Sequence, residues 1–307
     1  MKVRFAPTRL VRALPFPYRA PAIPRGVEPP RAKPRKGGAY DTDWARRWPA
    51  RATRLVLLNG VIKPAAKALA DPQFRGLDRL STLEGPAIFV ANHHSHLDTP
   101  LLLSSIPEPW RNKMFVGAAA DYFFSSPVTS ALSALVIGAI PIERSKVSRR
   151  GADQAADLID DGWSLTLFPE GGRSPDGWGQ EFRGGAAYLA LRCEVPVVPV
   201  HIAGTGKILG KGMKYPKPAR TRLTFGHPLA IEEGESSTHL NERIESAVAV
   251  LADESTTDWW EARRRVHAGT TPLLTGPDAP TWRRAWALGD RKGRLTAPKR
   301  RWPDLGQ

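Results

Sequence analysis

Residues 87–103, AIFVANHHSHLDTPLLL, pass from an apolar run through a polar cluster into a second apolar run. The first run is rich in β-branched and aromatic residues and predicts a buried strand, and the second predicts a helix. The polar cluster between them contains His93, His94, His96 and Asp98. A buried strand that leads through a polar turn into a helix is typical of α/β folds, which place catalytic side chains at the carboxyl ends of strands.

Short strand patterns of the same kind recur along the chain and alternate with helical patterns. Strands are predicted over residues 86–92, 114–119, 139–144, 164–170, 196–202 and 222–228. Helices are predicted over residues 125–138, 149–162, 185–193 and 238–254. This alternation predicts an α/β domain whose largely parallel or mixed sheet is flanked by helices.

The formal net charge of +15 is concentrated at the two ends of the chain. Residues 1–40 hold ten Lys and Arg against one acidic residue, and residues 281–307 hold eight against two. Such tails bind polyanions, so nucleic acid and an anionic membrane surface are both candidates, and a solubilising tail is the plainer alternative. The basic first segment is broken by prolines, unlike a signal peptide, and no run of eighteen apolar residues suits a membrane span.

The composition divides the chain into four parts. We predict a basic, proline-rich disordered tail (1–40), amphipathic membrane-interacting helices (41–75), a catalytic domain (76–254) and a basic, Trp- and Arg-rich extension (255–307). Within the second part, Pro49 and Pro64 are expected to end or kink the helix, and packing onto the domain is the alternative to membrane contact. The single cysteine, Cys193, excludes an intramolecular disulfide and a multi-cysteine metal site, and its apolar surroundings predict a buried thiol.

Two chemistries compete for the histidine cluster. In the first, one imidazole is a general base, and a carboxylate on its other ring nitrogen fixes the tautomer. In the second, several histidines ligate a metal, which requires convergent side chains, whereas those of His93 and His94 diverge on a strand. Ser95 is no better as a nucleophile, because no G-x-S-x-G turn surrounds it. A general base paired with Asp98 is therefore the favoured interpretation, and no metal is expected.

The segment NHHSHLD at residues 92–98 resembles the N-H-x-S-x-x-D signature of the glycerolipid acyltransferases, the lysophosphatidic-acid acyltransferase family. Three further blocks stand in the family's order: GAIPIER at 138–144, FPEGGRS at 168–174 and VPVVPV at 195–200. The resemblance covers roughly residues 80–230. It implies that 76–254 is an acyltransferase domain, with His93 and Asp98 as the catalytic pair.

The later blocks of the resemblance imply an acceptor that carries a phosphate. Arg144 and Arg173 each follow a predicted strand, and arginine suits bidentate phosphate binding, so we expect them on neighbouring strand ends around one phosphomonoester. Gly171 allows close approach of the backbone to the ligand. Glu170 is expected to fix an arginine or an acceptor hydroxyl. Gly172 stands where the family commonly has threonine, which leaves the acceptor head group open.

The resemblance implies acyl transfer from acyl-CoA or acyl carrier protein to 1-acyl-sn-glycerol 3-phosphate, giving phosphatidic acid for phospholipid biosynthesis. No cofactor is expected beyond this co-substrate. The alternatives are another acceptor (glycerol 3-phosphate or a different lysophospholipid), a His/Asp lipid hydrolase, or a basic membrane-binding protein. The expected partners are the lipid acceptor, the acyl donor and an anionic membrane surface, without nucleic acid. The expected location is peripheral, at the cytoplasmic face of the cell membrane.

Overall fold

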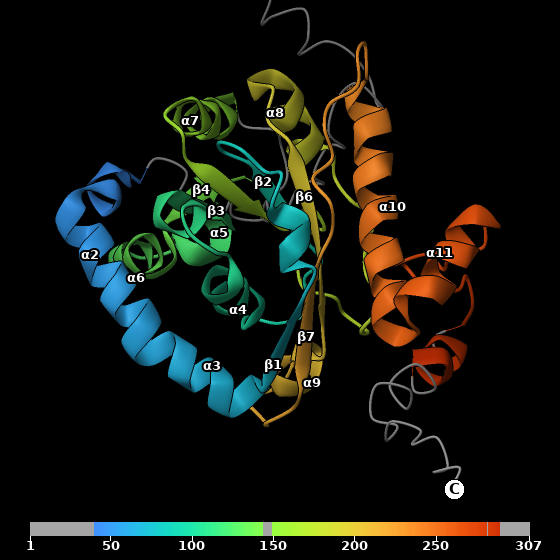
Figure 1. Ribbon diagram of the computed structural model, residues 1–307. Coiled ribbons are helices and arrows are strands. Elements are labelled where there is room, and N and C mark those ends of the chain that lie inside the picture. Colours follow the sequence, from blue (N-terminus) through green and yellow to red (C-terminus); the bar gives the residue numbers. More distant parts are fainter. Residues whose placement is uncertain (1–39, 144–148, 281, 289–307) are drawn as a thin grey trace, which may run out of the picture. The chain divides into compact units, whose positions relative to one another are not determined.

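A computed structural model describes residues 40–143, 149–280 and 282–288 of the chain. Within these ranges the centre is a seven-stranded sheet in the order β1-β7-β6-β2-β5-β3-β4 (Figure 1). The strands are β1 (Pro72–Arg75), β2 (Ile88–Ala91), β3 (Met114–Ala119), β4 (Ala139–Ile142), β5 (Ser164–Leu167), β6 (Val197–Ala203) and β7 (Thr221–Phe225). Neighbouring strands are parallel except β6 and β7, which are antiparallel. The predicted fold class, a largely parallel or mixed sheet flanked by helices, is confirmed.

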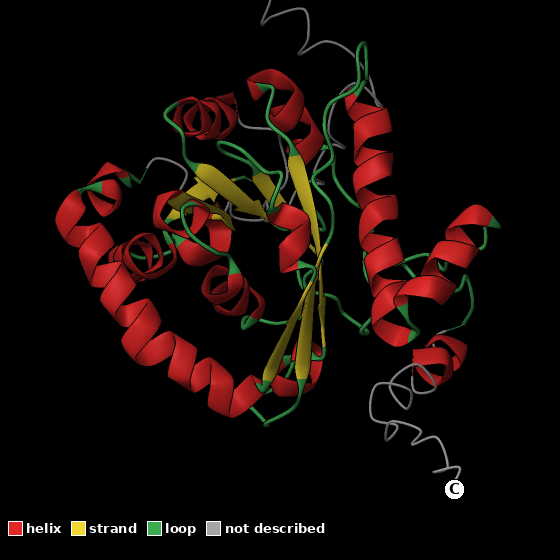
Figure 2. Cartoon of the chain, in the orientation of Figure 1, coloured by secondary structure: helices red, strands yellow, loops and turns green. Residues whose placement is uncertain are grey.

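Helices cover both faces of this sheet (Figure 2). They are α2 (Trp48–Leu57), α3 (Lys63–Ala70), α4 (Asp98–Ser105), α5 (Ala120–Phe123), α6 (Pro127–Ile137), α7 (Arg149–Asp160), α8 (Gly185–Cys193), α9 (Thr205–Leu209), α10 (Ser237–Thr256) and α11 (Trp259–His267). Short turns of 3-10 helix are η1 (Asp43–Arg46), η3 (Leu77–Leu80) and η4 (Trp110–Lys113). Residues 282–288 are also helical.

The alternation of side chains along β2 shows how the sheet builds two cores. Ile88 and Val90 point into a core shared with α7, α8 and α10, whereas Phe89 and Ala91 point into a core shared with α3, α4 and α9. All four side chains are fully buried. Burial of each large apolar side chain stabilises the fold by about 1.5–3 kcal/mol. The central strand is therefore fixed on both faces up to the point where the histidine cluster begins.

A continuous helical stretch runs from α2 to α3 along one side of the domain (Figure 1). Pro49 lies in the first turn of α2, where its missing N–H is tolerated. Pro64 does not end the helix, because the π-helical turn η2 (Leu58–Ile62) stands directly before it. A π turn shifts the hydrogen-bond register and accommodates the missing N–H group of the proline.

Two features of residues 41–75 were not predicted from the sequence. Residues Pro72–Arg75 form β1, an edge strand that pairs with β7, so the sheet begins before the predicted domain boundary. Arg54 of α2 donates at 2.7–2.9 Å to three main-chain carbonyls, one at Ala45 and two on α6. Burial lowers the pKa of Arg54 to about 10. Four residues are too few to show strand alternation, and main-chain acceptors for an arginine leave no trace in a sequence.

Other predictions concern residues that the structure describes partly or not at all. The tail 1–40, apart from Tyr40, and residues 289–307 of the extension lie outside the described residues. Among the helices of the described ranges, none is long and apolar enough to span a bilayer. Cys193 is a free thiol, half-buried beside the core, and burial raises its pKa.

Candidate active site

The candidate site lies at the carboxyl end of β2, between the ends of its parallel neighbours β5 and β6. The turn at residues 92–97 follows β2 and leads into α4, and the loop at residues 168–180 follows β5. Parallel strands bring such connections to one edge of the sheet. The first and third sequence blocks therefore adjoin, although 77 residues separate His93 from Glu170.

His93 and Asp98 meet in the geometry that a base and its carboxylate require. His93 Nδ1 lies 3.0 Å from Asp98 Oδ2. The Asp98 side chain is completely buried, and that of His93 is 16% exposed. A buried carboxylate beside Nδ1 holds the proton there and leaves the lone pair on Nε2. The imidazole also stacks on Phe168, with ring centroids 4.4 Å apart, which fixes its plane.

Asp98 holds the turn as well as the imidazole. The same atom, Oδ2, accepts the backbone N–H groups of His94 at 2.6 Å and of Ser95 at 2.7 Å. Asp98 is also the first residue of α4, where the helix N-terminus stabilises negative charge. Its other oxygen, Oδ1, is buried and has no hydrogen-bond partner within the described ranges. One carboxylate oxygen thus organises both the local backbone and the histidine ring.

The remaining signature residues, Asn92 and Ser95, secure the backbone around this pair. Asn92 donates through Nδ2 to the Ile202 carbonyl at 2.9 Å and accepts the Ile202 N–H through Oδ1 at 2.7 Å. These bonds continue the pairing of β2 with β6. The buried Ser95 hydroxyl donates to the Leu209 carbonyl at 2.9 Å. A hydroxyl engaged in this way anchors the turn and offers no support for a serine nucleophile.

Glu170 lies behind the histidine rather than in the open part of the site. Its side chain is 3% exposed; Oε1 accepts the His93 N–H at 2.8 Å, and Oε2 accepts the Gln180 N–H at 3.1 Å. Burial raises the pKa of Glu170 to about 8. Glu170 was expected to fix an arginine or an acceptor hydroxyl, but its recorded bonds go to main-chain groups. Gln180 could not be identified from the sequence, because it binds Glu170 through its backbone N–H.

A glycine turn with basic neighbours continues the third block. Gly171 has a φ of +68°, a conformation that favours glycine, and a Cβ there would meet the Arg183 guanidinium at 2.9–3.1 Å. Arg173 is half-buried. Burial, and then the charges of Arg173 and His93, lower the pKa of His96. Arg173 precedes Ser174, whose N–H donates to the His93 carbonyl at 2.8 Å, so the Arg173 main chain lies close to the histidine cluster. Arg183 lies beyond the motif, so no pattern singled it out.

The two strands that precede the predicted phosphate-binding arginines are not neighbours in the sheet. Arg144 lies outside the described residues. β4, which ends two residues before it, does not neighbour β5, because β3 lies between them. The expectation that the two arginines follow neighbouring strands is therefore wrong. Two interstrand spacings, about 10 Å, separate β4 from β5. Strand order in the chain does not fix strand order in the sheet.

His96 and an aromatic pair border the same site. The His96 ring stacks on Tyr122 from α5, with centroids 5.5 Å apart, and Tyr122 Oη lies 3.2 Å from His96 Nε2. Phe123 meets His96 edge-on at 6.5 Å. A cavity of about 280 Å³ is lined by His94, Ser174 and residues of β6 and α9. Neither His94 nor His96 had been given a role from the sequence.

Comparisons with known proteins identify the segment that carries this site. Residues 71–203 match the model of the family described as Acyltransferase. The chain is 35% identical over 142 residues to the chloroplastic 1-acyl-sn-glycerol-3-phosphate acyltransferase BAT2 of Brassica napus, which covers 45% of this chain and 39% of that protein. It is 36% identical over 141 residues to the chloroplastic 1-acyl-sn-glycerol-3-phosphate acyltransferase LPAT1 of Arabidopsis thaliana, covering 45% and 37%.

A solved structure shares the fold. The 1-acyl-sn-glycerophosphate (LPA) acyltransferase PlsC from Thermotoga maritima superposes with a TM-score of 0.53 at 22% identity, covering 73% of this chain and 82% of that one. The chain matches about two fifths of the length of the two curated relatives. Residues 71–203 are thus a domain of the acyltransferase family, which confirms the resemblance inferred from the four sequence blocks.

Proposed function

We propose that this acyltransferase-family chain transfers a fatty acyl group from a thioester donor to the free hydroxyl of 1-acyl-sn-glycerol 3-phosphate, giving phosphatidic acid. The observation that carries the proposal is the His93–Asp98 pair, joined at 3.0 Å, with the half-buried Arg173 directly before Ser174, whose N–H binds the His93 carbonyl. The relatives' names supply the acceptor. Acyl-CoA and acyl carrier protein both fit as donors, since each presents the same thioester, and no further cofactor enters the reaction.

In the proposed step, His93 acts as a general base. Nε2 takes the proton of the acceptor hydroxyl while that oxygen attacks the thioester carbonyl. The carbon–sulfur bond then breaks, and the departing thiolate takes the proton back from the imidazolium. Asp98 stabilises the positive charge of this imidazolium, because its carboxylate is buried and only 3.0 Å away. General-base assistance of this kind is worth about 10²–10⁴ in rate.

The acceptor phosphate is proposed to bind Arg173, with Arg144 as a second arginine. A guanidinium holds a phosphate by two parallel hydrogen bonds and so fixes the direction of the attached glycerol. Holding the hydroxyl at a set distance from Nε2 makes the transfer effectively intramolecular. Burial, and then the charges of Arg173 and His93, lower the pKa of His96, which disfavours an additional positive charge on that imidazole.

Identification of the products tests this proposal. Purified protein is given mixed acyl-CoAs with lysophosphatidate, glycerol 3-phosphate or other lysophospholipids, and the lipids are identified by mass spectrometry. We expect phosphatidic acid that depends on lysophosphatidate and is lost in His93→Ala. His227→Ala, at an exposed histidine after β7, is the matched control and should keep its activity. Free fatty acid released equally with and without acceptor would instead identify a hydrolase.

Peripheral binding to an anionic membrane surface is a second part of the proposal, with the cytoplasmic face of the cell membrane as the location. The α2–η2 stretch leaves Trp48 77% exposed and Val56 71% exposed, and Arg47 is exposed beside them. Exposed tryptophan and basic residues suit the interface of a bilayer. Removal of residues 1–40 should weaken sedimentation with anionic vesicles, more at low salt than at high salt. Unchanged sedimentation would exclude that segment as the anchor.

A further inference from the structure

The loop at residues 174–180 holds the main chain of His93 from both sides. At its start, the Ser174 N–H donates to the His93 carbonyl at 2.8 Å. At its end, the Gln180 N–H donates to Glu170, whose other oxygen accepts the His93 N–H. One end of the loop therefore binds the His93 carbonyl directly, and the other end is joined to the His93 N–H through Glu170. A displacement of this loop is therefore expected to shift the main chain of His93.

The middle of the loop is bound by a segment about a hundred residues further along the chain, residues 272–280 and 282–288, which we name the brace. Arg284 donates to Asp176 Oδ2 through Nη2 at 2.9 Å and through Nε at 3.1 Å. The Arg284 carbonyl accepts the indole N–H of Trp178 at 3.1 Å. The Gly179 N–H donates to the Leu274 carbonyl at 2.9 Å. Three residues of the loop, Asp176, Trp178 and Gly179, thus form hydrogen bonds with the brace.

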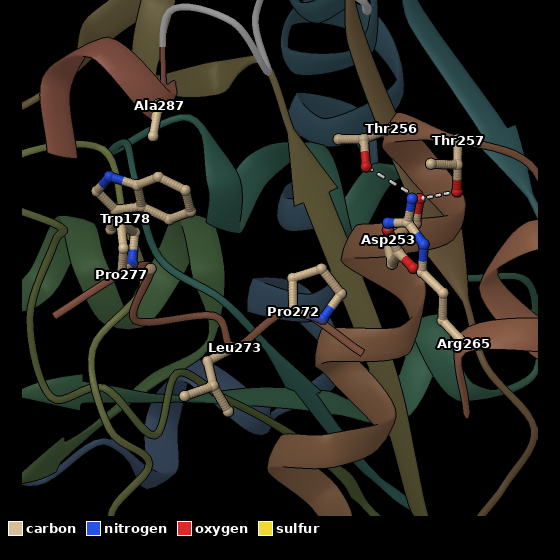
Figure 3. Close-up of a pocket in the computed structure, with 10 residues that line it drawn as sticks. Trp178, Asp253, Thr256, Thr257, Arg265, Pro272, Leu273, Pro277 and Ala287 are labelled. Carbon is tan, nitrogen blue, oxygen red and sulfur yellow. Dashed lines mark hydrogen bonds and ion pairs between the residues drawn. The ribbon is translucent and has the colours of Figure 1, made fainter. Parts of the chain in front are cut away.

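Close packing reinforces these bonds. A Cβ on Gly276 would lie 2.4 Å from the Trp178 ring, and a Cβ on Gly177 would lie 2.6 Å from the Leu288 side chain. Trp178 is 6% exposed and Leu288 is 9% exposed. Figure 3 shows Trp178 and Pro277 on one side of a pocket of about 460 Å³, opposite Asp253 and Arg265. The brace therefore packs on the loop on one side and borders a cavity towards the end of α10.

We propose that the brace positions His93 through the 174–180 loop, and that Arg284 is a positioning residue of the transfer reaction. This inference rests on the proposed function. The Arg284–Asp176 ion pair is partly exposed, at 26% and 31%, and such exposed pairs contribute little to stability. Displacement of a catalytic group by about 1 Å can lower a rate about 10²-fold. Loss of the ion pair should therefore affect turnover far more than unfolding.

The test compares two adjacent arginines of the same helix. Arg284→Ala should lower kcat about tenfold while the thermal midpoint stays close to that of the unaltered protein. Arg283→Ala is the matched control. The exposed Arg283 guanidinium lies 5.0 Å from the Trp282 ring and forms no hydrogen bond with residues 174–180. This substitution should leave kcat unchanged. Combining Asp176→Arg with Arg284→Asp should restore part of the activity that each single change removes.

Amide hydrogen exchange provides a readout that does not depend on activity. In Arg284→Ala, the amides of residues 174–180 should exchange faster, whereas those of β2 should not change. Unaltered exchange in the loop, or unaltered kcat, would overturn the proposal. A loss of kcat that follows a fall in the thermal midpoint, without rescue by the charge swap, would reduce Arg284 to a stabilising role. If the unaltered protein transfers no acyl group but the exchange result holds, the proposed function is wrong. The brace would then still be shown to hold the 174–180 loop.

Discussion

The turn after β2 and the loop after β5 form two halves of one site but are held in opposite ways. Asp98 organises its turn from within, through groups three to five residues away. The 174–180 loop is bound from outside by Arg284, 108 residues from Asp176. The comparison teaches that a base and its carboxylate within one turn can be recognised in a sequence, whereas the contacts that a distant segment makes to a loop cannot.

The largest effect is expected where the turn organises itself. Asp98→Asn keeps the shape of the side chain but removes the charge that stabilises the His93 imidazolium. We expect kcat to fall on the order of 10²–10⁴-fold, measured from initial rates at saturating substrates. Circular dichroism and the thermal midpoint serve as folding controls. A rate within about tenfold of the unaltered protein would show that catalysis by His93 does not require an anionic partner.

A smaller effect is expected in the loop half of the site. Arg173→Ala should raise the acceptor KM about 10- to 100-fold, since a hydrogen bond to a charged group contributes about 1.5–3 kcal/mol. The donor KM should stay the same. Arg192→Ala, at an exposed arginine of α8 paired with Asp153, is the control. A rise in the donor KM alone would indicate that Arg173 binds the acyl donor rather than the acceptor.

Glu170, which joins the two halves, should give the site a pH-dependent stability. Its pKa is raised to about 8 in the folded protein, so between pH 4.5 and 8 the unfolded chain loses a proton that the folded chain keeps. This contribution to the free energy of unfolding is full below pH 4.5 and declines as pH rises through 8. Glu170→Gln should make the decline between pH 5 and 8 shallower in urea unfolding. Glu242→Gln, at an exposed position of α10, should not; an unchanged slope in Glu170→Gln would contradict the buried, protonated state.

The smallest effect on catalysis is expected at Ser95. Its hydroxyl bonds to the Leu209 carbonyl, so Ser95→Ala should lower the free energy of unfolding by about 1–3 kcal/mol and leave kcat nearly unchanged. Urea denaturation and initial rates check the two halves of this prediction. Complete loss of transfer in a folded Ser95→Ala protein would indicate that Ser95 is a nucleophile. It would contradict a purely anchoring role for the hydroxyl.

The parts that the sequence could predict are those with a local physical cause. The predicted strands from 86–92 to 222–228 correspond to β2 through β7, because each carries a run of apolar residues between turn residues. The closeness of His93 to Asp98 also follows from a short turn. The neighbours of β5 could not be predicted, since connections of similar length can lead to either side of it. The contacts of Arg284 and Arg54 depend on main-chain and side-chain partners that only the folded chain brings together.

The edge strand β1 determines how the chain could be shortened for expression. A protein that began at residue 76, the boundary suggested by composition, would lack the strand that pairs with Thr221–Thr224. The outer backbone groups of β7 would then be open to solvent, and an uncovered strand edge invites pairing with another molecule. The same cut would remove Arg54, which joins α2 to α6 through two carbonyls. A shortened protein that begins near residue 40 keeps both features and should remain monodisperse where the shorter one aggregates.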